Sequence, residues 1–333
     1  MKAAVLKTHN QPFAFEELPI PEPGPGQALI RMHACGMCGT DVHVWRGLFP
    51  STPPIVLGHE PVGTIEKLGD GVTWLAKGDR VGVPWVQSGC GRCPACVEHH
   101  EIYCTEARTW MENGGGWSAF MIAEATGCIL IPEALSWENA APMFCAGFTV
   151  MSGYRNGQPR TGDRIAILGV GGLGHLALQV AKAMGHETIA VTGTASKKTE
   201  LLELGADDVV VVKEHAGKEL AAAGGADLVL SSTNAMNQNA DVLAGLRPEG
   251  RLVIMGVGAE PISLVPFMNL MGQVTVKFSM QNRRRDLMEV LDLAARGKVR
   301  PKLEIYPLER VNETLQRLID GKVRYRAVLT HAH

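Results

Sequence analysis

Residues 164–174 read RIAILGVGGLG, and this stretch decides the fold of the middle of the chain. A short apolar run typical of a buried strand leads directly into a G-x-G-x-x-G match. Such glycines permit a tight turn and let the backbone approach a pyrophosphate, whose charge the following helix N-terminus favours. The alternative is a glycine-rich turn without a ligand. The sequence therefore predicts a dinucleotide-binding turn made by Gly169, Gly171, Gly172, Leu173 and Gly174.

The glycine turn opens a repeating pattern of helices and strands. Apolar residues recur on one helical face from Leu173 to Met184, and Gly185 suits the end of that helix. Further short β-branched runs alternate with helical patterns. Six strands separated by helices imply a doubly wound parallel sheet, the Rossmann architecture. The predicted strands are residues 164–168, 188–192, 208–212, 226–231, 251–255 and 274–278.

The end of the second predicted strand bears on the choice of cofactor. An acidic residue there accepts the ribose 2'-hydroxyl of NAD and would repel the 2'-phosphate of NADP. Here the position is Thr192, and residues 192–198 hold two lysines and no carboxylate. We expect NADP(H), with NAD(H) as the alternative if the lysines only solvate a helix start. The expected contacts are Thr192, Thr194, Ser196 and Lys197.

The regions before and after these six strands differ from them in composition and predicted structure. Residues 1–147 contain joints rich in Pro and Gly between short alternating runs, which indicates mainly irregular β structure. After Phe278, two helices are predicted over residues 284–296 and 310–320, and Gly321 ends the second. No internal repeat is visible.

Four cysteines stand close together as C-x2-C-x2-C-x7-C in a segment where regular structure is not expected. Four thiolates at this spacing can enclose one tetrahedral Zn2+, which would order the loop and leave no position open for substrate. Unrelated thiols and an iron–sulfur cluster are the alternatives. A nucleic-acid-binding zinc ribbon is disfavoured by the glutamates in the same segment. The four are Cys90, Cys93, Cys96 and Cys104.

A second group of metal-ligating residue types lies earlier in the chain. Cys38 follows an apolar run, and His59 with Glu60 comes soon after. Cysteine and histidine are ligands that zinc accepts. From these residues alone, a nucleophile with its base, or a buried thiol with a structural histidine, would fit equally well.

Together, the cysteine loop, the spacing of Cys38 and His59, and the glycine turn resemble the zinc-containing branch of the medium-chain dehydrogenase/reductase family, over nearly the whole chain. The resemblance implies an α/β protein with a GroES-like, mainly β catalytic domain (residues 1–147 and 279–333) and a Rossmann domain (residues 148–278). It implies two zinc ions per chain, one structural at the cysteine loop and one catalytic. The ligands implied for the catalytic zinc are Cys38, His59 and Cys145, with Glu60 close to the metal and Asp41 orienting His59.

The chemistry implied by the resemblance is reversible hydride transfer between an alcohol or aldehyde and the nicotinamide cofactor. Bound Zn2+ lowers the pKa of a coordinated hydroxyl group, so the alcohol reacts as a zinc alkoxide. Thr40 and His43 are implied to relay its proton to solvent. The residue after Cys38 departs from many family members: it is Gly39, not a basic residue that would contact the pyrophosphate.

Further site residues also follow from the resemblance. Thr149, Gly256 and Val257 are implied to line the cofactor, together with Ser232 and residues 279–281. Phe49 and Trp85 fall where family members line the substrate cleft, and we add Trp110 from the same group of aromatic residues. An apolar pocket of this kind suits primary aliphatic or benzylic alcohols and aldehydes.

Composition and the lack of targeting signals bear on the partners and the location of the protein. The net charge is −2 and no sustained basic run occurs, which argues against nucleic acid as the partner. Because the sequence shows neither a secretory signal nor an apolar run of about 18 residues, we expect a cytoplasmic protein without a membrane partner. By resemblance, we expect a homodimer or homotetramer. The alternatives are an NAD-dependent alcohol or polyol dehydrogenase and a non-catalytic zinc- and NADPH-binding protein; zinc-free quinone reductases lack these cysteines.

Overall fold

The computed structural model describes residues 1–332, and the chain divides into two compact units. Unit 1 contains Met1–Cys145, Asn282–Arg296 and Pro301–His333; unit 2 contains Ala146–Gln281 and Gly297–Arg300. The expected boundaries at 147/148 and 278/279 lie within three residues of these limits. One short piece differs: residues 297–300, expected in the catalytic domain, group with unit 2.

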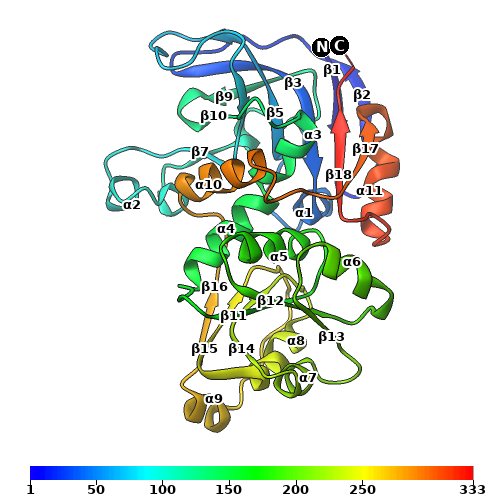
Figure 1. Cartoon of the computed structure of the whole chain (residues 1–333). Helices are drawn as coiled ribbons and strands as arrows, with labels where there is room; N and C mark the ends of the chain where they lie inside the picture. Colours follow the sequence, from blue (N-terminus) through cyan, green and yellow to red (C-terminus); the bar gives the residue numbers. More distant parts are fainter. Residues whose placement is uncertain (333) are drawn as a thin grey trace. The chain divides into compact units, whose positions relative to one another are not determined.

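Unit 2 is built on a six-stranded, fully parallel sheet with the order β13-β12-β11-β14-β15-β16 (Figure 1). All six strands predicted from the sequence are present. Their bounds are β11 Arg164–Leu168, β12 Glu187–Thr192, β13 Asp208–Val211, β14 Ala226–Ser231, β15 Leu246–Ile254 and β16 Thr275–Phe278. Its helices are α4 Ala146–Asn156, α5 Gly174–Ala183, α6 Lys198–Glu203, α7 Ala216–Ala222, α8 Met236–Asp241 and α9 Pro266–Gly272.

The glycine turn joins β11 to α5, as its sequence predicts. Gly169 has a φ of 80°, a conformation that a residue with a side chain rarely adopts. At Gly174, a Cβ atom would lie 2.1 Å from the carbonyl oxygen of Gly169, so only glycine allows the helix to start this close to the strand. The turn is therefore fixed by contacts within unit 2.

The edge of this sheet carries an exposed apolar surface. None of the residues of α9 is buried, and the side chains of Phe267, Leu270 and Phe278 are 68 to 70% exposed. Large exposed apolar patches of this kind mark interaction surfaces. We call Leu264–Phe278 the apolar edge.

Unit 1 is mainly β, with a seven-stranded sheet in the order β10-β6-β5-β3-β18-β17 and β9 paired to β3. The strands are β3 Gln27–Met37, β5 Glu60–Leu68, β6 Arg80–Gly82, β9 Phe120–Glu124, β10 Ile129–Leu130, β17 Leu303–Pro307 and β18 Arg326–Thr330. Two smaller sheets contain β2-β1-β4 and β7-β8, where β1 is Lys2–Leu6, β2 Ala14–Glu17, β4 Ile55–Val56, β7 Val86–Ser88 and β8 Arg108–Thr109.

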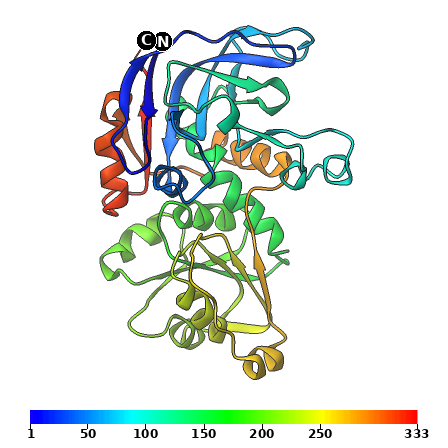
Figure 2. The same ribbon diagram turned by 180° about the vertical axis from the view of Figure 1, so that it is seen from behind.

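The C-terminal segment completes unit 1. The two helices predicted there are present as α10 Arg284–Ala295 and α11 Val311–Ile319. Figure 2 shows β18 and α11 beside the N-terminal strand β1, and the Lys2 ammonium pairs with the Glu309 carboxylate at 2.5 Å. Strand β18 lies in the main sheet, where it pairs with β3. Within residues 1–332, no helix has the length and apolar character needed to span a membrane.

Candidate active site and metal centres

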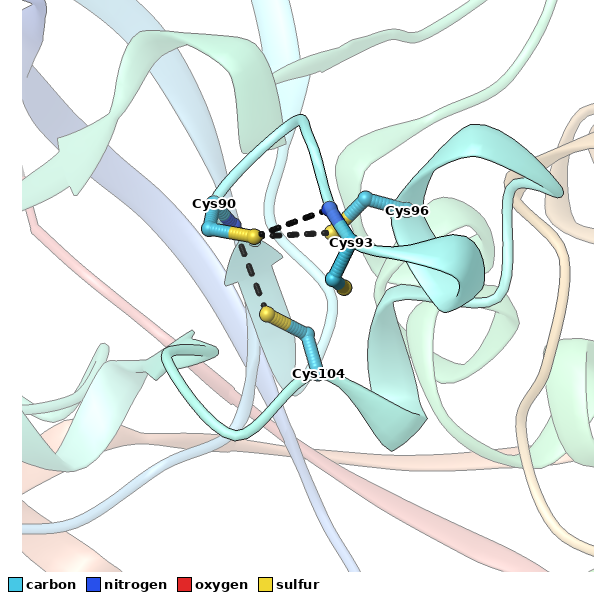
Figure 3. A group of neighbouring side chains, drawn as sticks. All are labelled: Cys90, Cys93, Cys96 and Cys104. Carbon is cyan, nitrogen blue, oxygen red and sulfur yellow. Dashed lines mark hydrogen bonds between the residues drawn. The ribbon is translucent and has the colours of Figure 1, made fainter.

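The cysteine loop gathers its four sulfur atoms at one point (Figure 3). All four Sγ atoms lie within 4.8 Å of one another, and the Sγ atoms of Cys90 and Cys96 are 4.0 Å apart. Helix α2, Pro94–Val97, carries Cys96, and Cys93 is its N-cap. A tetrahedral zinc with Zn–S bonds of about 2.3 Å places sulfur atoms about 3.8 Å apart. The donor set therefore fits one zinc ion.

Backbone groups of the loop already point at these sulfurs. The N–H of Cys93 donates to the Sγ of Cys90 at 3.3 Å, and the N–H of Cys90 donates to the Sγ of Cys104 at 3.4 Å. Hydrogen bonds from the backbone of Arg92 and Cys93 lower the pKa of Cys90 to about 7, whereas burial raises that of Cys96 to about 12. With four protein sulfurs around it, a metal here has no open position.

A second group contains Cys38, His59, Glu60 and Cys145, all buried. The Cys38 Sγ lies 3.3 Å from the His59 Nε2 and 3.9 Å from the Cys145 Sγ, and the Nε2 and the Cys145 Sγ are 3.2 Å apart. Tetrahedral zinc with two sulfurs and one nitrogen requires separations of about 3.5 to 3.8 Å. The three donors fit zinc within a few tenths of an ångström, and a carboxylate oxygen of Glu60 lies within 4.8 Å of all three.

The sheet of unit 1 brings two of these donors together. Cys38 follows β3 directly and His59 precedes β5, and the two strands pair with Gly36 opposite Glu60. A Cβ on Gly36 would lie 1.8 Å from the Glu60 Oε2, so glycine is required there. Cys38 also caps α1, Gly39–Trp45, in a capping box with Asp41. The strand ladder and the cap thus fix where Cys38 and His59 lie.

Asp41 sets the orientation of the histidine. Its Oδ1 lies 2.8 Å from the Nδ1 of His59, and its Oδ2 accepts the backbone N–H of Cys38 at 2.9 Å. Because a carboxylate only accepts, Asp41 keeps a proton on the Nδ1 of His59 and directs Nε2 toward the two sulfurs. Asp41 thus lies where the resemblance implies.

The buried ionisable groups of this centre shift the pKa values of their neighbours. The Cys145 thiol donates a hydrogen bond to Cys38, which lowers the pKa of Cys38 and raises that of Cys145. Burial alone would lower the pKa of His59, but the charges of Asp41 and Cys38 outweigh it and raise that pKa. Burial raises the pKa of Glu60 to about 7. A centre rich in buried anionic groups favours a bound cation.

Glu60 has a partner that the sequence did not indicate. Arg326, on β18, is 3% exposed and its guanidinium forms an ion pair with the Oε1 of Glu60. Among the described residues 1–332, the buried Oε2 of Glu60 has no hydrogen-bond partner. A lone arginine in the otherwise apolar final strand was the only signal available. The pair holds Glu60 beside Cys38 and His59.

The other residues expected in unit 1 lie around this centre. The backbone N–H of Thr40 donates to the Cys38 Sγ at 3.3 Å, and His43 follows in the same helix. The rings of Phe49, Trp85 and Trp110 form a contiguous group, and both tryptophans contact the ring of His59. Trp110 is only 1% exposed.

The residues expected to bind the cofactor all belong to unit 2. The buried Thr192 ends β12, Thr149 lies on α4, and the exposed Thr194 and Ser196 follow the strand. The Lys197 ammonium donates to the carbonyl oxygen of Val170, within the glycine turn, at 3.2 Å. Gly256 packs where a Cβ would meet the carbonyl oxygen of Thr233 at 2.0 Å, and Val257 is 53% exposed. Lys197 is thus drawn to the turn and does not extend into solvent.

Comparisons with known proteins agree with this architecture. Residues 24–133 match the model of the alcohol dehydrogenase GroES-like domain, and residues 172–296 match that of the zinc-binding dehydrogenases. An alcohol dehydrogenase of Geobacillus stearothermophilus is 38% identical over 337 residues, covering 99% of each chain.

Two further relatives extend this picture. An aldehyde reductase of Synechocystis is 32% identical, over 97% of this chain and 95% of its own. The crystal structure of the alcohol dehydrogenase of Aeropyrum pernix superposes with a TM-score of 0.91 at 30% identity, over 99% of this chain and 100% of the other. The predicted fold class is confirmed, and the chain belongs to the zinc-binding, medium-chain alcohol dehydrogenase family.

Proposed function

We propose that this protein is a zinc-dependent alcohol dehydrogenase and aldehyde reductase that transfers hydride between NADP(H) and primary aliphatic or benzylic alcohols and aldehydes. One observation carries the proposal: Cys38, His59 and Cys145 come from separate parts of the sequence and meet, with the Glu60 carboxylate beside them, as one buried group of metal-ligating side chains. While Glu60 pairs with Arg326, a zinc held by Cys38, His59 and Cys145 would keep its fourth position for substrate, as catalytic zinc sites do.

Three residues would hold the catalytic metal, and others would orient them. When bound, zinc supplies a Lewis acid that favours the loss of the alcohol proton and polarises an aldehyde carbonyl. Asp41 keeps the Nε2 of His59 available, and the ion pair of Glu60 with Arg326 keeps a second carboxylate close by. The protein thus presents an arranged donor set before the substrate arrives.

Thr40 and His43 are proposed to carry the proton. The backbone bond from Thr40 to the Cys38 sulfur fixes Thr40 beside a ligand, and His43 stands one helical turn away on α1. Histidine exchanges protons with solvent near neutral pH. The Thr40 hydroxyl would accept the substrate proton, and His43 would release it to solvent.

The apolar part of the substrate is proposed to lie against Phe49 and Trp85; Trp110, expected from the sequence to line the pocket, is 1% exposed and packs behind Trp85. The ring centroids of Phe49 and Trp85 are 6.2 Å apart, and those of Trp85 and Trp110 are 5.6 Å apart. Aromatic walls favour flat or slender apolar groups and offer little to a chain of hydroxyls. A substrate panel should therefore rank primary aliphatic and benzylic alcohols above polyols; the reverse ranking would point to a polyol dehydrogenase.

The preference for NADP(H) rests on Thr192 and Lys197. No carboxylate occurs from residue 192 to residue 198, and the Lys197 ammonium lies at the glycine turn. A 2'-phosphate would gain a cation there and meet no opposing charge. Because Lys198 is exposed, the variant Lys198→Ala is a matched control for Lys197→Ala.

The cofactor experiment compares kcat/KM for NADPH and NADH in the wild type and in both lysine variants. We expect NADPH to be preferred, and Lys197→Ala to reduce that preference about tenfold, the worth of one half-buried charge-assisted contact. Lys198→Ala should leave the ratio close to that of the wild type. Equal or better use of NADH by the wild type would refute the assignment.

We also propose that the protein forms a homodimer or homotetramer through the apolar edge. Strand β16 is the last strand of its sheet, and Phe267, Leu270 and Phe278 expose most of their side chains beside it. A second copy could pair its own strand with β16 and cover the exposed apolar side chains of this edge. Light scattering after gel filtration should give a multiple of the 35.8 kDa mass of one chain.

Because metal-binding thiolates persist in reducing surroundings, we propose that the protein is located in the cytoplasm.

A further inference from the structure

Cys145 reaches the three-donor centre by a different route from Cys38 and His59. The latter two flank neighbouring strands, whose ladder sets their separation. Cys145 ends a short segment made of α3, Trp137–Ala140, and η4, Ala141–Phe144. We call residues 136–145 the Cys145 arm. Helices of four residues are not stable by themselves, so contacts with the rest of unit 1 must hold the arm in place.

The outer end of the arm is held through Trp137, whose indole lies between two side chains of the main sheet. The His33 ring stacks on it at 4.4 Å between centroids with an interplanar angle of 8°. The Arg80 guanidinium lies 4.2 Å from the centroid of a Trp137 ring. Arg80 also donates to the carbonyl oxygens of Glu133 and Leu135, just before the arm. Trp137 is thus joined to both β3 and β6.

The inner end is held through Phe144, the residue before Cys145. Phe144 is fully buried, and a Cβ on Gly82 would lie 2.2 Å from its Cζ atom. The ring therefore rests directly on the backbone of β6. Gly82 and Arg80 are two residues apart in that strand, so they present the same face of the sheet to the arm. The short strand β6 therefore contacts the arm at both ends, through Arg80 and Gly82.

We propose that Trp137 and Phe144 are positioning residues that, through β6, hold the Cys145 thiolate against Cys38 and His59. The inference rests on the proposed role of Cys145 as a zinc ligand. Neither aromatic residue need touch substrate or cofactor. If the arm loosens, the zinc loses one of three protein donors more often and leaves the site faster, while the cysteine loop is unaffected.

The first experiment measures zinc release from the full-length protein loaded with two zinc ions. A chromogenic chelator records the loss of each ion over time in the wild type, Trp137→Ala and Trp137→Phe. We expect Trp137→Ala to release one of the two ions about tenfold faster, since a cation–π contact and a ring stack together contribute a factor of this order. Trp137→Phe, which keeps a ring between His33 and Arg80, should recover most of the difference.

Phe120→Ala is the matched control. Phe120 is half-buried in the same sheet and lies 5.1 Å from the Arg31 guanidinium, yet belongs to β9 and not to the arm. Its removal deletes a comparable ring and cation contact, so both zinc ions should leave at the wild-type rates. The ion held by the cysteine loop also reports within each variant whether unit 1 is folded.

A second pair of variants tests the inner end. Gly82→Ala places a methyl group against the Phe144 ring and should shift Cys145, whereas adding Phe144→Leu makes room for it. With Co2+ in the three-donor site, Gly82→Ala should alter the sulfur-to-cobalt absorption bands, and the double variant should restore them. A general loss of stability would not follow this pattern.

The outcomes separate the inference from the proposed function. If the wild-type protein bound only the zinc ion of the cysteine loop, both the proposed function and this inference would be wrong. If the wild type binds two ions but Trp137→Ala releases both at wild-type rates, or both equally faster, the arm does not position Cys145 and only this inference is wrong. An unchanged cobalt spectrum in a folded Gly82→Ala variant would also overturn it.

Discussion

The two cysteine-rich centres of unit 1 are assembled in opposite ways. The cysteine loop takes all four donors from residues 90–104, and two of them, Cys90 and Cys93, are only partly buried. The three-donor centre takes its ligands from residues 38 to 145, and all of them are buried. A local centre can order itself around its metal, whereas a dispersed one depends on the surrounding fold.

The difference extends to the neighbouring charges. Asp41, Glu60 and Arg326 surround the three-donor centre and are all at most 3% exposed. Near the cysteine loop, the ion pair of Arg92 with Glu106 is exposed to solvent. Buried ion pairs are costly, so their presence at one centre only indicates a task beyond structure there. The following predictions test this contrast, from the largest expected effect on activity to the smallest.

The largest effect should follow the loss of a dispersed ligand. In Cys145→Ala, zinc content should fall from two ions per chain to one, and kcat/KM should drop by about 10³-fold, because a Lewis acid contributes several kcal/mol to catalysis. Metal analysis and steady-state kinetics measure the two quantities. Cys128→Ala, another buried cysteine, should retain both ions. A Cys145→Ala protein with two zinc ions and normal turnover would contradict the assignment.

A smaller effect should follow the loss of the charge on Asp41. Asp41→Asn keeps the shape but weakens the hold on the His59 imidazole, so zinc affinity at this centre should fall about 10- to 100-fold. Competition with a chelator measures it. Asp79→Asn is the control, since Asp79 also accepts a backbone N–H but lies on the surface. Equal zinc affinities in the two variants would remove the orienting role of Asp41.

The smallest effect on activity should follow the loss of a ligand in the cysteine loop. Cys104→Ser should also reduce the zinc content to one, yet kcat/KM per folded chain should change by less than about threefold, which corresponds to under ~0.7 kcal/mol. The melting temperature should fall instead, by roughly 10 °C for a few kcal/mol of stability. Calorimetry and kinetics together check this. If turnover collapsed while the melting temperature held, the two centres would have exchanged roles.

Sequence patterns predicted unit 2 well because its periodicities are local. All six strands were found, and most ends agree within one residue. The exception is β15, which begins at Leu246, five residues before the predicted start. Residues 247–250 contain Pro, Glu and Gly, with Glu249 at a φ of 59°, so they read as a turn although the strand continues through a register shift. The residue types at 247–250 favour a turn, but pairing with β14 keeps the segment in the strand.

Unit 1 was much less predictable, since its order comes from contacts between distant residues. Helix α1 was missed because its cap is Cys38, which is not among the usual N-capping residues. The cluster of four cysteines could be found by spacing alone. Cys145 required the family resemblance. Arg326 gave only the signal of a lone arginine in a mainly apolar strand, and Trp137 gave none, because their roles depend on partners in other strands.

The ion pair between Glu60 and Arg326 also has a consequence for the order of events during synthesis. Glu60 leaves the ribosome early, but its guanidinium partner follows only after the whole of unit 2. Domains generally fold as they emerge, N-terminal parts first. Here the cysteine loop can take up its metal early in translation, while the buried carboxylate stays unpaired until β18 joins the sheet. A chain that stops before Arg326 would therefore leave the buried Glu60 carboxylate without its cation beside Cys38 and His59.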